Sequence, residues 1–271
     1  MLVDIGANLT HDSFDADREA VLSRARAAGV AAMIVTGSTL ADTEAAIALC
    51  RKHPEVLRAT AGVHPHHATS LGGADAARLA ELASDPLVVA AGECGLDYYR
   101  NFSPPAEQRR AFDLQLGLAA RLNKPLFLHQ RDARGDFLAM LRDHPEVAGR
   151  AVLHCFTEGP DMLEECLALG LSIGVTGWIC DERRGEALRA SAPRIPDDRL
   201  MLETDAPYLL PRTLQPRPAH RRNEPAFLAA VLEETARCRG ESPETLARLT
   251  AGNACRFFGL TLAALGDTHQ D

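Results

Sequence analysis

The sequence predicts a (β/α)8 barrel, a fold in which eight parallel strands alternate with eight helices. Three observations predict it: eight short apolar or β-branched runs, a longer stretch with helical spacing after each run, and a length of 271 residues. A doubly wound open sheet is the competing fold. No G-x-G-x-x-G follows the first apolar run, however, and the chain contains no Walker A sequence. We therefore expect one barrel domain spanning residues 1–271.

The apolar runs are the expected strands, and they lie at 2–8, 31–37, 57–64, 87–93, 125–130, 150–156, 171–178 and 199–205. The segments between them are rich in Ala, Leu, Glu and Arg, with apolar residues at the spacing of one helix face. The expected helices lie near 15–28, 41–52, 74–84, 105–122, 133–143, 160–169, 182–191 and 224–238, and a last helix near 243–257 ends the fold.

The first expected strand contains VDIGANL, residues 3–9, which has an unusual polar face. Strict alternation places its apolar residues on one face and Asp4, Gly6 and Asn8 on the other. An acid, a glycine and an amide line a hydrophobic core poorly. We therefore expect these three residues to face the barrel interior, with Asn8 nearest the mouth.

Composition excludes several classes of protein. The net charge of −8 argues against a surface coated for nucleic acid. No run of 18 apolar residues predicts a membrane span, and the N-terminus lacks the pattern of a signal peptide. Seven scattered cysteines without a C-x-x-C fit a reducing compartment and favour neither a zinc ribbon nor a thioredoxin motif. We expect a cytoplasmic monomer with no membrane partner.

Titratable residues end four of the expected strands, where barrel enzymes place their chemistry. Glu93 ends the fourth strand, His129 the fifth, His154 the sixth and Asp205 the eighth. Any one of them alone is explained by a hydrogen-bonded core histidine or a helix N-cap. Together they would bury several ionisable groups at one place, which costs free energy unless something compensates them. A divalent cation is the simplest compensator, and zinc, manganese, iron or magnesium suits such ligands.

Other residues near the strand ends have two interpretations. Glu203, two positions before Asp205, either orients a ligand or is a structural acid satisfied by backbone donors. Trp178 either stacks on a base or packs at the barrel rim. Alternation turns Cys94 and Cys155 outward, so we interpret them as small buried apolar residues.

Arginines follow three of the expected strands. Arg131 lies two residues beyond His129, and the loops after the seventh and eighth strands carry Arg183, Arg184, Arg221 and Arg222. Those two loops often form the phosphate site of this barrel, and a guanidinium matches phosphate geometry. These arginines either bind phosphate or pair with surface acids. They favour a phosphate ester over an amide as the substrate.

Eight motifs together resemble the TatD family of metal-dependent deoxyribonucleases, and the likeness runs from residue 2 to about 260. They are VDIGANLT, GVHPHH, GECGLDYYRNFS, PLFLHQRDA, VLHCFTEG, TGWICDERRG, LMLETDAPYLLP and RRNEP. The resemblance implies an amidohydrolase-like TIM barrel, magnesium or manganese dependence, and 3′-to-5′ exonuclease activity on single-stranded DNA and RNA.

The resemblance also implies roles for individual residues. Glu93, His129 and His154 match the family's metal ligands, Asp205 matches a residue that binds metal or water, and His64 matches one that assists substrate or proton handling. One departure lies on the first strand, where most of the family has H-x-H and this chain has Gly6, Ala7 and Asn8. We therefore expect one firmly held ion, and a second ion bound more weakly between Glu93, Asp205 and water.

The sequence thus predicts a metal-dependent phosphodiesterase with Asp205 as the general base for an attacking water and His64 and the arginines holding the phosphate. We expect magnesium, with manganese or zinc as alternatives, at one or two ions per chain. Asn8 is expected to hydrogen-bond a water or substrate oxygen. Two alternatives remain open: a hydrolase of C–N or lactone bonds, and a metal-binding protein without turnover.

Overall fold

The computed structural model describes residues 1–261, and their eight strands form one parallel sheet in chain order. The strands are β1 (Leu2–Ala7), β2 (Val30–Val35), β3 (Leu57–Ala61), β4 (Val88–Asp97), β5 (Leu126–Arg131), β6 (Ala151–Leu153), β7 (Ser172–Val175) and β8 (Leu200–Leu202). β1 also meets β8, because the N–H of Asn8 donates to the carbonyl of Ala206 at 2.7 Å and that of Asp205 to Gly6 at 2.8 Å. The predicted (β/α)8 barrel is confirmed. Residues 262–271 of the expected single domain lie outside the described residues.

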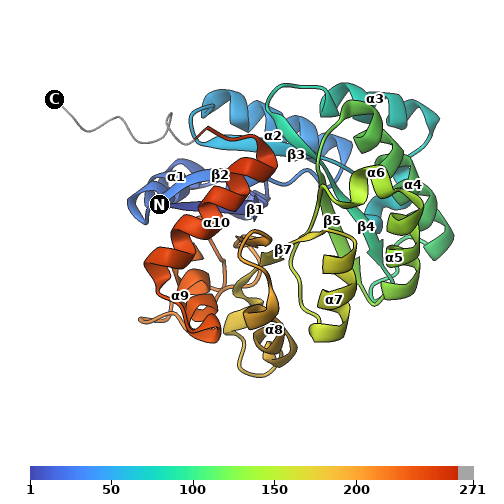
Figure 1. Ribbon diagram of the computed structural model, residues 1–271. Helices are drawn as coiled ribbons and strands as arrows, with labels where there is room; N and C mark the ends of the chain where they lie inside the picture. Colours follow the sequence, from blue (N-terminus) through green and yellow to red (C-terminus); the bar gives the residue numbers. More distant parts are fainter. Residues whose placement is uncertain (262–271) are drawn as a thin grey trace.

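Helices surround the sheet, as Figure 1 shows. They are α1 (Arg18–Ala27), α2 (Leu40–Lys52), α3 (Gly73–Ala83), α4 (Pro105–Leu122), α5 (Arg134–Asp143), α6 (Pro145–Ala148), α7 (Pro160–Ala168), α8 (Glu186–Ser191), α9 (Leu228–Arg239) and α10 (Pro243–Phe258). α8 begins four residues later than predicted, since the Asp181 carboxylate accepts the N–H groups of Arg183 and Arg184 and holds a turn there. Within residues 1–261, no helix is both long and apolar enough to span a membrane.

Two apolar clusters separate the inside of the barrel from its helical shell. The inner cluster gathers side chains from six strands and from α10: Val3, Ile5, Ala32, Ile34, Ala90, Phe127, Val152, Met201, Ala251, Ala254, Cys255 and Phe258. The outer cluster lies between the strands and the surrounding helices and includes Cys94, as predicted. α10 packs against β1 and β8 and contributes side chains to the inner cluster. The polar candidate residues lie at the other end of the barrel, where the strands have their carboxyl ends.

β1 corrects the prediction for its polar face. Its pairing with β2 shifts register between Asp4 and Ala7, which marks a β-bulge. Val3 and Ile5 therefore belong to the inner cluster, while Asp4 accepts hydrogen bonds from the backbone N–H and hydroxyl of Thr204. The expectation that Asp4 faces the interior was wrong, because simple alternation does not continue through a bulge.

Several strands end earlier than predicted, so the candidate residues lie just beyond them. β3 stops at Ala61, and His64 caps the 3-10 turn η2 (Pro65–Ser70). β6 stops at Leu153 and β8 at Leu202; Cys155 and Asp205 then take positive φ angles of 47° and 55°. Since the chain leaves regular strand geometry at these points, alternation no longer determines where the next side chains point.

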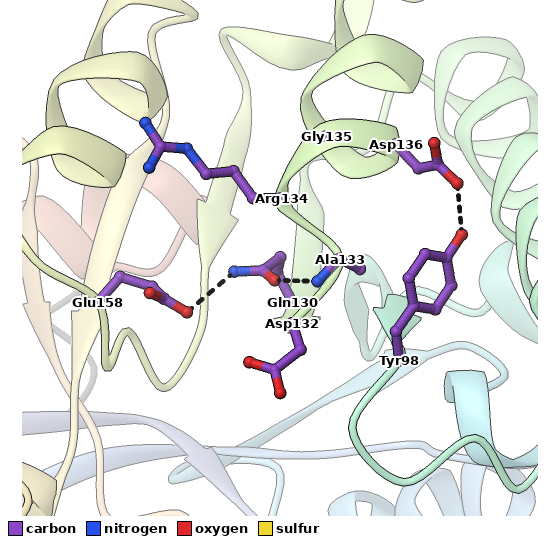
Figure 2. A pocket seen from close by; sticks show the side chains of 8 residues that line it. All are labelled: Tyr98, Gln130, Asp132, Ala133, Arg134, Gly135, Asp136 and Glu158. Carbon is purple, nitrogen blue, oxygen red and sulfur yellow. Dashed lines mark hydrogen bonds between the residues drawn. The ribbon is translucent and has the colours of Figure 1, made fainter.

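The turn from β5 into α5 is held by side chains (Figure 2). The Gln130 side-chain carbonyl accepts the N–H of Ala133 at 2.9 Å, and its amide reaches Glu158 at 3.5 Å. The hydroxyl of Tyr98, from the loop after β4, donates to Asp136 of α5 at 2.6 Å. These contacts tie the loop after β4 to the end of β5, and both border the candidate site described next.

Candidate active site

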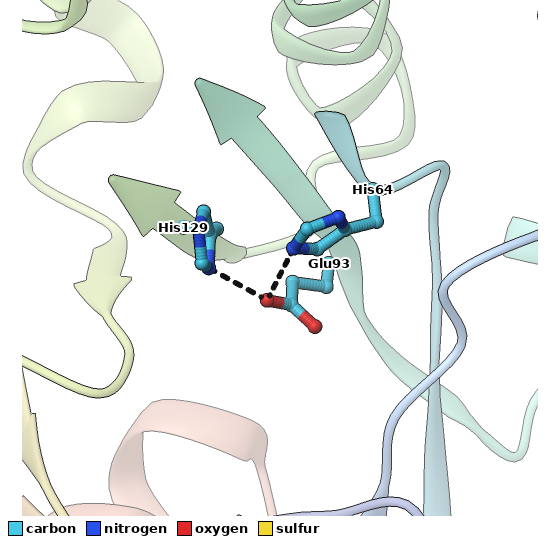
Figure 3. Close-up of side chains that lie close together, drawn as sticks. All are labelled: His64, Glu93 and His129. Carbon is cyan, nitrogen blue, oxygen red and sulfur yellow. Dashed lines mark ion pairs between the residues drawn. The ribbon is translucent and has the colours of Figure 1, made fainter. Parts of the chain in front are cut away.

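Glu93 lies at the centre of a buried group of imidazoles (Figure 3). Its Oε1 atom is 3.1 Å from Nδ1 of His129, 3.4 Å from Nε2 of His64 and 3.4 Å from Nε2 of His154. Burial alone raises the pKa of Glu93, but His64 and His154, with hydrogen bonds from His129 and His154, hold the pKa well below its ordinary value. Glu93 is therefore a carboxylate at neutral pH and attracts positive charge to this point.

His129 and His154 have acidic partners on their outer ring nitrogens. Nδ1 of His154 lies 2.8 Å from Glu203 Oε2, and Nε2 of His129 lies 3.6 Å from Asp97 Oδ2. The Glu203 carboxylate, at hydrogen-bond distance, keeps the proton of a neutral His154 ring on Nδ1 and leaves a lone pair on Nε2. Nε2 of His129 has no hydrogen-bond partner among residues 1–261. Burial lowers the pKa of His154, yet Glu203 and Glu93 outweigh burial and raise it well above its ordinary value. The carboxylates around the two rings therefore create a negative electrostatic potential that favours a cation next to Glu93.

His64 has the opposite proton arrangement. Its Nδ1 accepts the backbone N–H of His66 at 3.1 Å, so the proton of the neutral ring lies on Nε2, which faces Glu93. Burial lowers the pKa of His64 to about 4, so the ring is neutral at neutral pH. His64 is therefore suited to donate a hydrogen bond rather than to ligate a cation.

The donor set around Glu93 fits a divalent cation. Two ligand atoms about 2.1 Å from one ion, at tetrahedral or octahedral angles, lie about 3.0–3.4 Å apart. The distances from Glu93 Oε1 to the inner nitrogens of His129 and His154 fall at the two ends of this interval. Without an ion or a proton, lone pairs would face one another across these gaps. Candidate ligand atoms of His64, Glu93 and His129 lie within 4.8 Å of one another, and Nε2 of His154 approaches the same Glu93 oxygen at 3.4 Å.

Glu203 is completely buried inside the barrel. Besides His154, it accepts the N–H of Cys155 at 2.6 Å. Its carboxylate occupies space that two glycines leave open: a Cβ at Gly6 would lie 2.5 Å from Oε2, and one at Gly174 would lie 2.5 Å from Oε1. The glycine in VDIGANL is therefore required by the close approach of Glu203.

Replacing Gly6 with alanine is expected to displace Glu203, since the added methyl would also lie 2.9 Å from Phe127. His154 would then lose its outer partner. Loss of such partners typically weakens metal affinity about 10–100-fold. Titration with manganese by calorimetry, against Gly135→Ala, where a Cβ meets nothing within 4 Å, measures the effect. Equal affinities in the two variants would contradict this role of Gly6.

Asp205 and Asn8 meet across the seam between β8 and β1. The Asn8 side-chain amide donates to Oδ1 of Asp205 at 3.0 Å. Burial raises the pKa of Asp205 to about 7, with Glu93 and Glu203 adding to the rise and His154 opposing it. Asp205, His154 and Cys155 also form a second group whose candidate ligand atoms lie within 4.8 Å of one another.

One cavity of about 690 Å³ collects most of the residues predicted from the sequence. Its lining includes Asn8, His64, Glu93, His129, Arg131, His154, Arg184 and Asp205. Glu203 lies beneath it as the buried partner of His154. A neighbouring cavity of about 560 Å³, drawn in Figure 2, shares Gln130, Asp132 and Glu158 with it.

The predicted phosphate-binding arginines are not all brought to this cavity. Arg131 and Arg184 line it, while Arg183, Arg221 and Arg222 do not. Arg222 instead forms a two-pronged ion pair with Asp17 at 2.7 and 2.8 Å, which holds the long loop after β8 against the start of α1. Arg222 is therefore occupied as a structural residue.

The sequence interpretation missed several residues of the cavity. Cys155 lines it, contrary to the outward orientation expected from alternation, because the chain turns to positive φ there. His66 and Asp97, which pair at 2.7 Å, and the exposed Tyr99 and Tyr208 line it as well. His66 and Asp97 were predicted to stand near strand ends but were assigned no role, and Tyr99 and Tyr208 in the same motifs were not singled out.

Trp178 shows features of both of its interpretations. It lines the cavity, yet it packs against the outer cluster and its Nε1 donates to the carbonyl of Arg184 at 3.1 Å. The guanidinium of Arg184 lies 4.3 Å from the ring centroid and pairs with Asp181 at 2.8 Å. These contacts favour packing at the barrel rim.

A (β/α)8 barrel with imidazoles and carboxylates gathered at the carboxyl ends of its strands has the fold of a metal-dependent hydrolase. The family model described as TatD related DNase matches residues 3–259. The chain belongs to this family.

Named relatives and solved structures agree with this family assignment. The chain is 52% identical over 259 residues to a 3′-5′ ssDNA/RNA exonuclease TatD of Erwinia tasmaniensis, covering 96% of this chain and 100% of the relative. The TatD homolog YJJV of Escherichia coli K12 superposes with a TM-score of 0.87 at 28% identity, over 96% of this chain and 98% of that one. A TatD family hydrolase of Entamoeba histolytica gives 0.88 at 26%, with the same coverage.

Proposed function

We propose that this protein is a metal-dependent 3′-5′ exonuclease that hydrolyses single-stranded DNA and RNA. The observation that carries the proposal is the group of Glu93, His129 and His154 at the floor of a cavity that also contains Asp205 and Arg131. The family membership and the names of relatives 52% identical to the chain support the substrate and the direction of attack.

Glu93, His129 and His154 would hold a divalent cation, which supplies a Lewis acid that lowers the pKa of water and neutralises phosphate charge. We propose magnesium, with manganese or zinc as alternatives. One ion would be held firmly, and a second more weakly near Glu93 and Asp205. Carboxylate ligands together with open positions for water suit magnesium.

The protein's own groups would then divide the remaining work. Asp205 accepts the proton of the attacking water, with Asn8 fixing its Oδ1 atom. His64 donates its Nε2 proton to a phosphate oxygen, because its Nδ1 is already an acceptor. Arg131 pairs with a phosphate; among residues 1–261 no carboxylate lies within 4.0 Å of its guanidinium.

Arg131 provides a prediction about salt. Each phosphate contact to a single strand contributes about 0.7 to the slope of log affinity against log salt. We expect Arg131→Gln to weaken DNA binding at every sequence and to reduce this slope by about 0.7. Arg222→Gln, the matched control, is expected to leave the slope unchanged and to lower the melting temperature, because it breaks the pair with Asp17. Fluorescence anisotropy of labelled oligonucleotides over a salt series measures both slopes, and equal slopes for the wild type and Arg131→Gln would contradict the contact.

One time course tests the proposed function. End-labelled single-stranded DNA and RNA are digested with chelator-treated protein and with magnesium- or manganese-loaded protein, and bound metal is counted per chain. We expect stepwise shortening from the 3′ end only with metal. Undiminished cleavage after chelation would reject the metal mechanism, and cleavage of C–N or lactone substrates with intact DNA ends would favour the alternative hydrolase.

The proposal places the enzyme in the cytoplasm as a monomer. All seven cysteines are free, which suits a reducing compartment. Sedimentation of the purified protein at micromolar concentration tests the monomeric state.

A further inference from the structure

Exposed aromatic side chains surround the mouth of the cavity. Among the residues that the structure describes, four large apolar side chains are exposed, and three of them, Tyr99, Phe102 and Tyr208, lie here. Tyr99 and Tyr208 line the cavity, and the ring of Phe102 lies 4.8 Å from that of His66, which also lines it. Such a concentration of exposed apolar surface marks a binding surface.

Tyr99 is paired with a cation. The guanidinium carbon of Arg131 lies 4.1 Å from the centroid of the Tyr99 ring, while 58% of Tyr99 remains exposed. The two residues lie at neighbouring strand ends, because Asp97, two residues before Tyr99 and the last residue of β4, pairs with Arg131 at the end of β5. The Arg131 guanidinium therefore lies over one face of the Tyr99 ring, and no carboxylate of residues 1–261 lies within 4.0 Å of it.

The backbone fixes Tyr99 relative to the candidate active site. Oδ1 of Asp97 accepts the N–H groups of Tyr99 at 3.0 Å and Arg100 at 2.8 Å. Asp97 is itself buried and lies beside the outer nitrogen of His129, with its Oδ2 atom 3.6 Å away. The turn that presents Tyr99 is thus anchored on the carboxylate that faces a candidate metal ligand.

Tyr98, which precedes Tyr99 in the same turn, has a structural role and serves as a comparison. Tyr98 is half-buried, donates its hydroxyl to Asp136 and packs against the outer cluster (Figure 2). Tyr99 has no such partner for its ring other than Arg131 and Arg100. Packing therefore explains the position of Tyr98 but not that of Tyr99.

We propose that Tyr99 and Arg131 form a nucleobase-binding site in which an unpaired base stacks on the exposed surface of the Tyr99 ring and Arg131 binds the adjoining phosphate. The inference rests on the proposed function and adds a determinant for single-stranded substrate. A base inside a duplex has both faces covered by its neighbours, so only an unpaired base can present a face to Tyr99. Stacking reads no base edge, and the site therefore favours single strands without favouring a sequence.

Abasic substrates test the site. A single-stranded DNA is prepared with all bases present, and again with one tetrahydrofuran abasic residue at each of the last four positions from the 3′ end. We expect one abasic position to lower kcat/KM of the wild type about 5- to 150-fold, the range for loss of one stacked base. Tyr99→Leu should lower kcat/KM on the intact strand to the value that the wild type has on the abasic strand. Removing the base at that position should then have no further effect on the variant. Tyr99→Phe should retain the wild-type pattern, and so should the control Tyr98→Phe.

A metal-free measurement separates this inference from the proposed function. With 2-aminopurine at the sensitive position, or at each of the four positions in turn, binding in chelator should quench its fluorescence in the wild type and in Tyr99→Phe, but not in Tyr99→Leu. The site is rejected, and the nuclease function is retained, if the wild type cleaves DNA but no abasic position lowers kcat/KM. The same conclusion follows if Tyr99→Leu lowers kcat/KM equally on the intact and the abasic strands. If the protein cleaves no strand, the proposed function fails, and the quenching alone decides whether Tyr99 stacks on a base.

Discussion

Replacing Glu93 with glutamine is expected to abolish metal binding and catalysis together while leaving the barrel folded. Glu93 is the only carboxylate that meets all three imidazoles of His64, His129 and His154 within 3.4 Å in the described structure. Glutamine keeps the shape but removes the negative charge that attracts a cation between them. The expected fall in metal affinity exceeds the roughly 10–100-fold typical for partners that only orient a ligand.

The measurements are bound metal per chain, kcat/KM on single-stranded DNA, and thermal denaturation. Glu164→Gln is the matched control, since Glu164 is exposed on α7 and, among residues 1–261, pairs only with Arg194 at 3.4 Å. The control should match the wild type in all three. A Glu93→Gln protein that still binds one magnesium ion per chain at wild-type affinity would refute the assignment.

The sequence predicted the barrel because its signals are periodic and repeated. Each strand is an apolar run and each helix an amphipathic one, so a shift of a few residues at a boundary, such as the four at the start of α8 (Glu186), leaves the topology unchanged. The ligand candidates could be predicted for a related reason. Glu93, His129 and His154 stand at the ends of strands that a barrel directs to one place, whatever the local register.

What alternation could not predict lies where the backbone departs from it. The bulge in β1 places Asp4 beside Thr204 rather than in the interior, and a positive φ angle turns Cys155 towards the cavity. A sequence pattern also could not predict which ring nitrogen of each histidine carries the proton. The backbone N–H of His66 distinguishes His64 from the other two imidazoles, and only coordinates reveal that contact. In the same way, Arg222 differs from Arg131 because Asp17 lies beside one and not the other.

Replacing Asp205 with asparagine is expected to lower kcat about 10²–10⁴-fold, the usual contribution of a general base, while metal is retained by Glu93, His129 and His154. Asparagine keeps an Oδ1 atom that can accept the hydrogen bond from Asn8, so the seam between β8 and β1 should be preserved. Asp198→Asn, an exposed position shortly before β8, is the control. A metal-binding protein without turnover predicts that Asp205→Asn leaves the biological role intact, so loss of that role with metal still bound would exclude it.

The same substitution should change how the metal-free protein responds to pH. Burial raises the pKa of Asp205 to about 7 from an ordinary 3.8, so between these values the folded chain holds a proton that the unfolded chain has released. The free energy of unfolding therefore falls as pH rises from about 4 to 7, and Asp205→Asn removes this contribution. Melting temperatures in chelator should fall more steeply over this window in the wild type than in the variant. Magnesium should offset the fall in the wild type, because a cation beside Asp205 stabilises the carboxylate in place of its proton. If the melting temperatures of the wild type and the variant change with pH in parallel in chelator, Asp205 is already ionised in the folded chain. A raised pKa would then not explain how Asp205 accepts a proton from water.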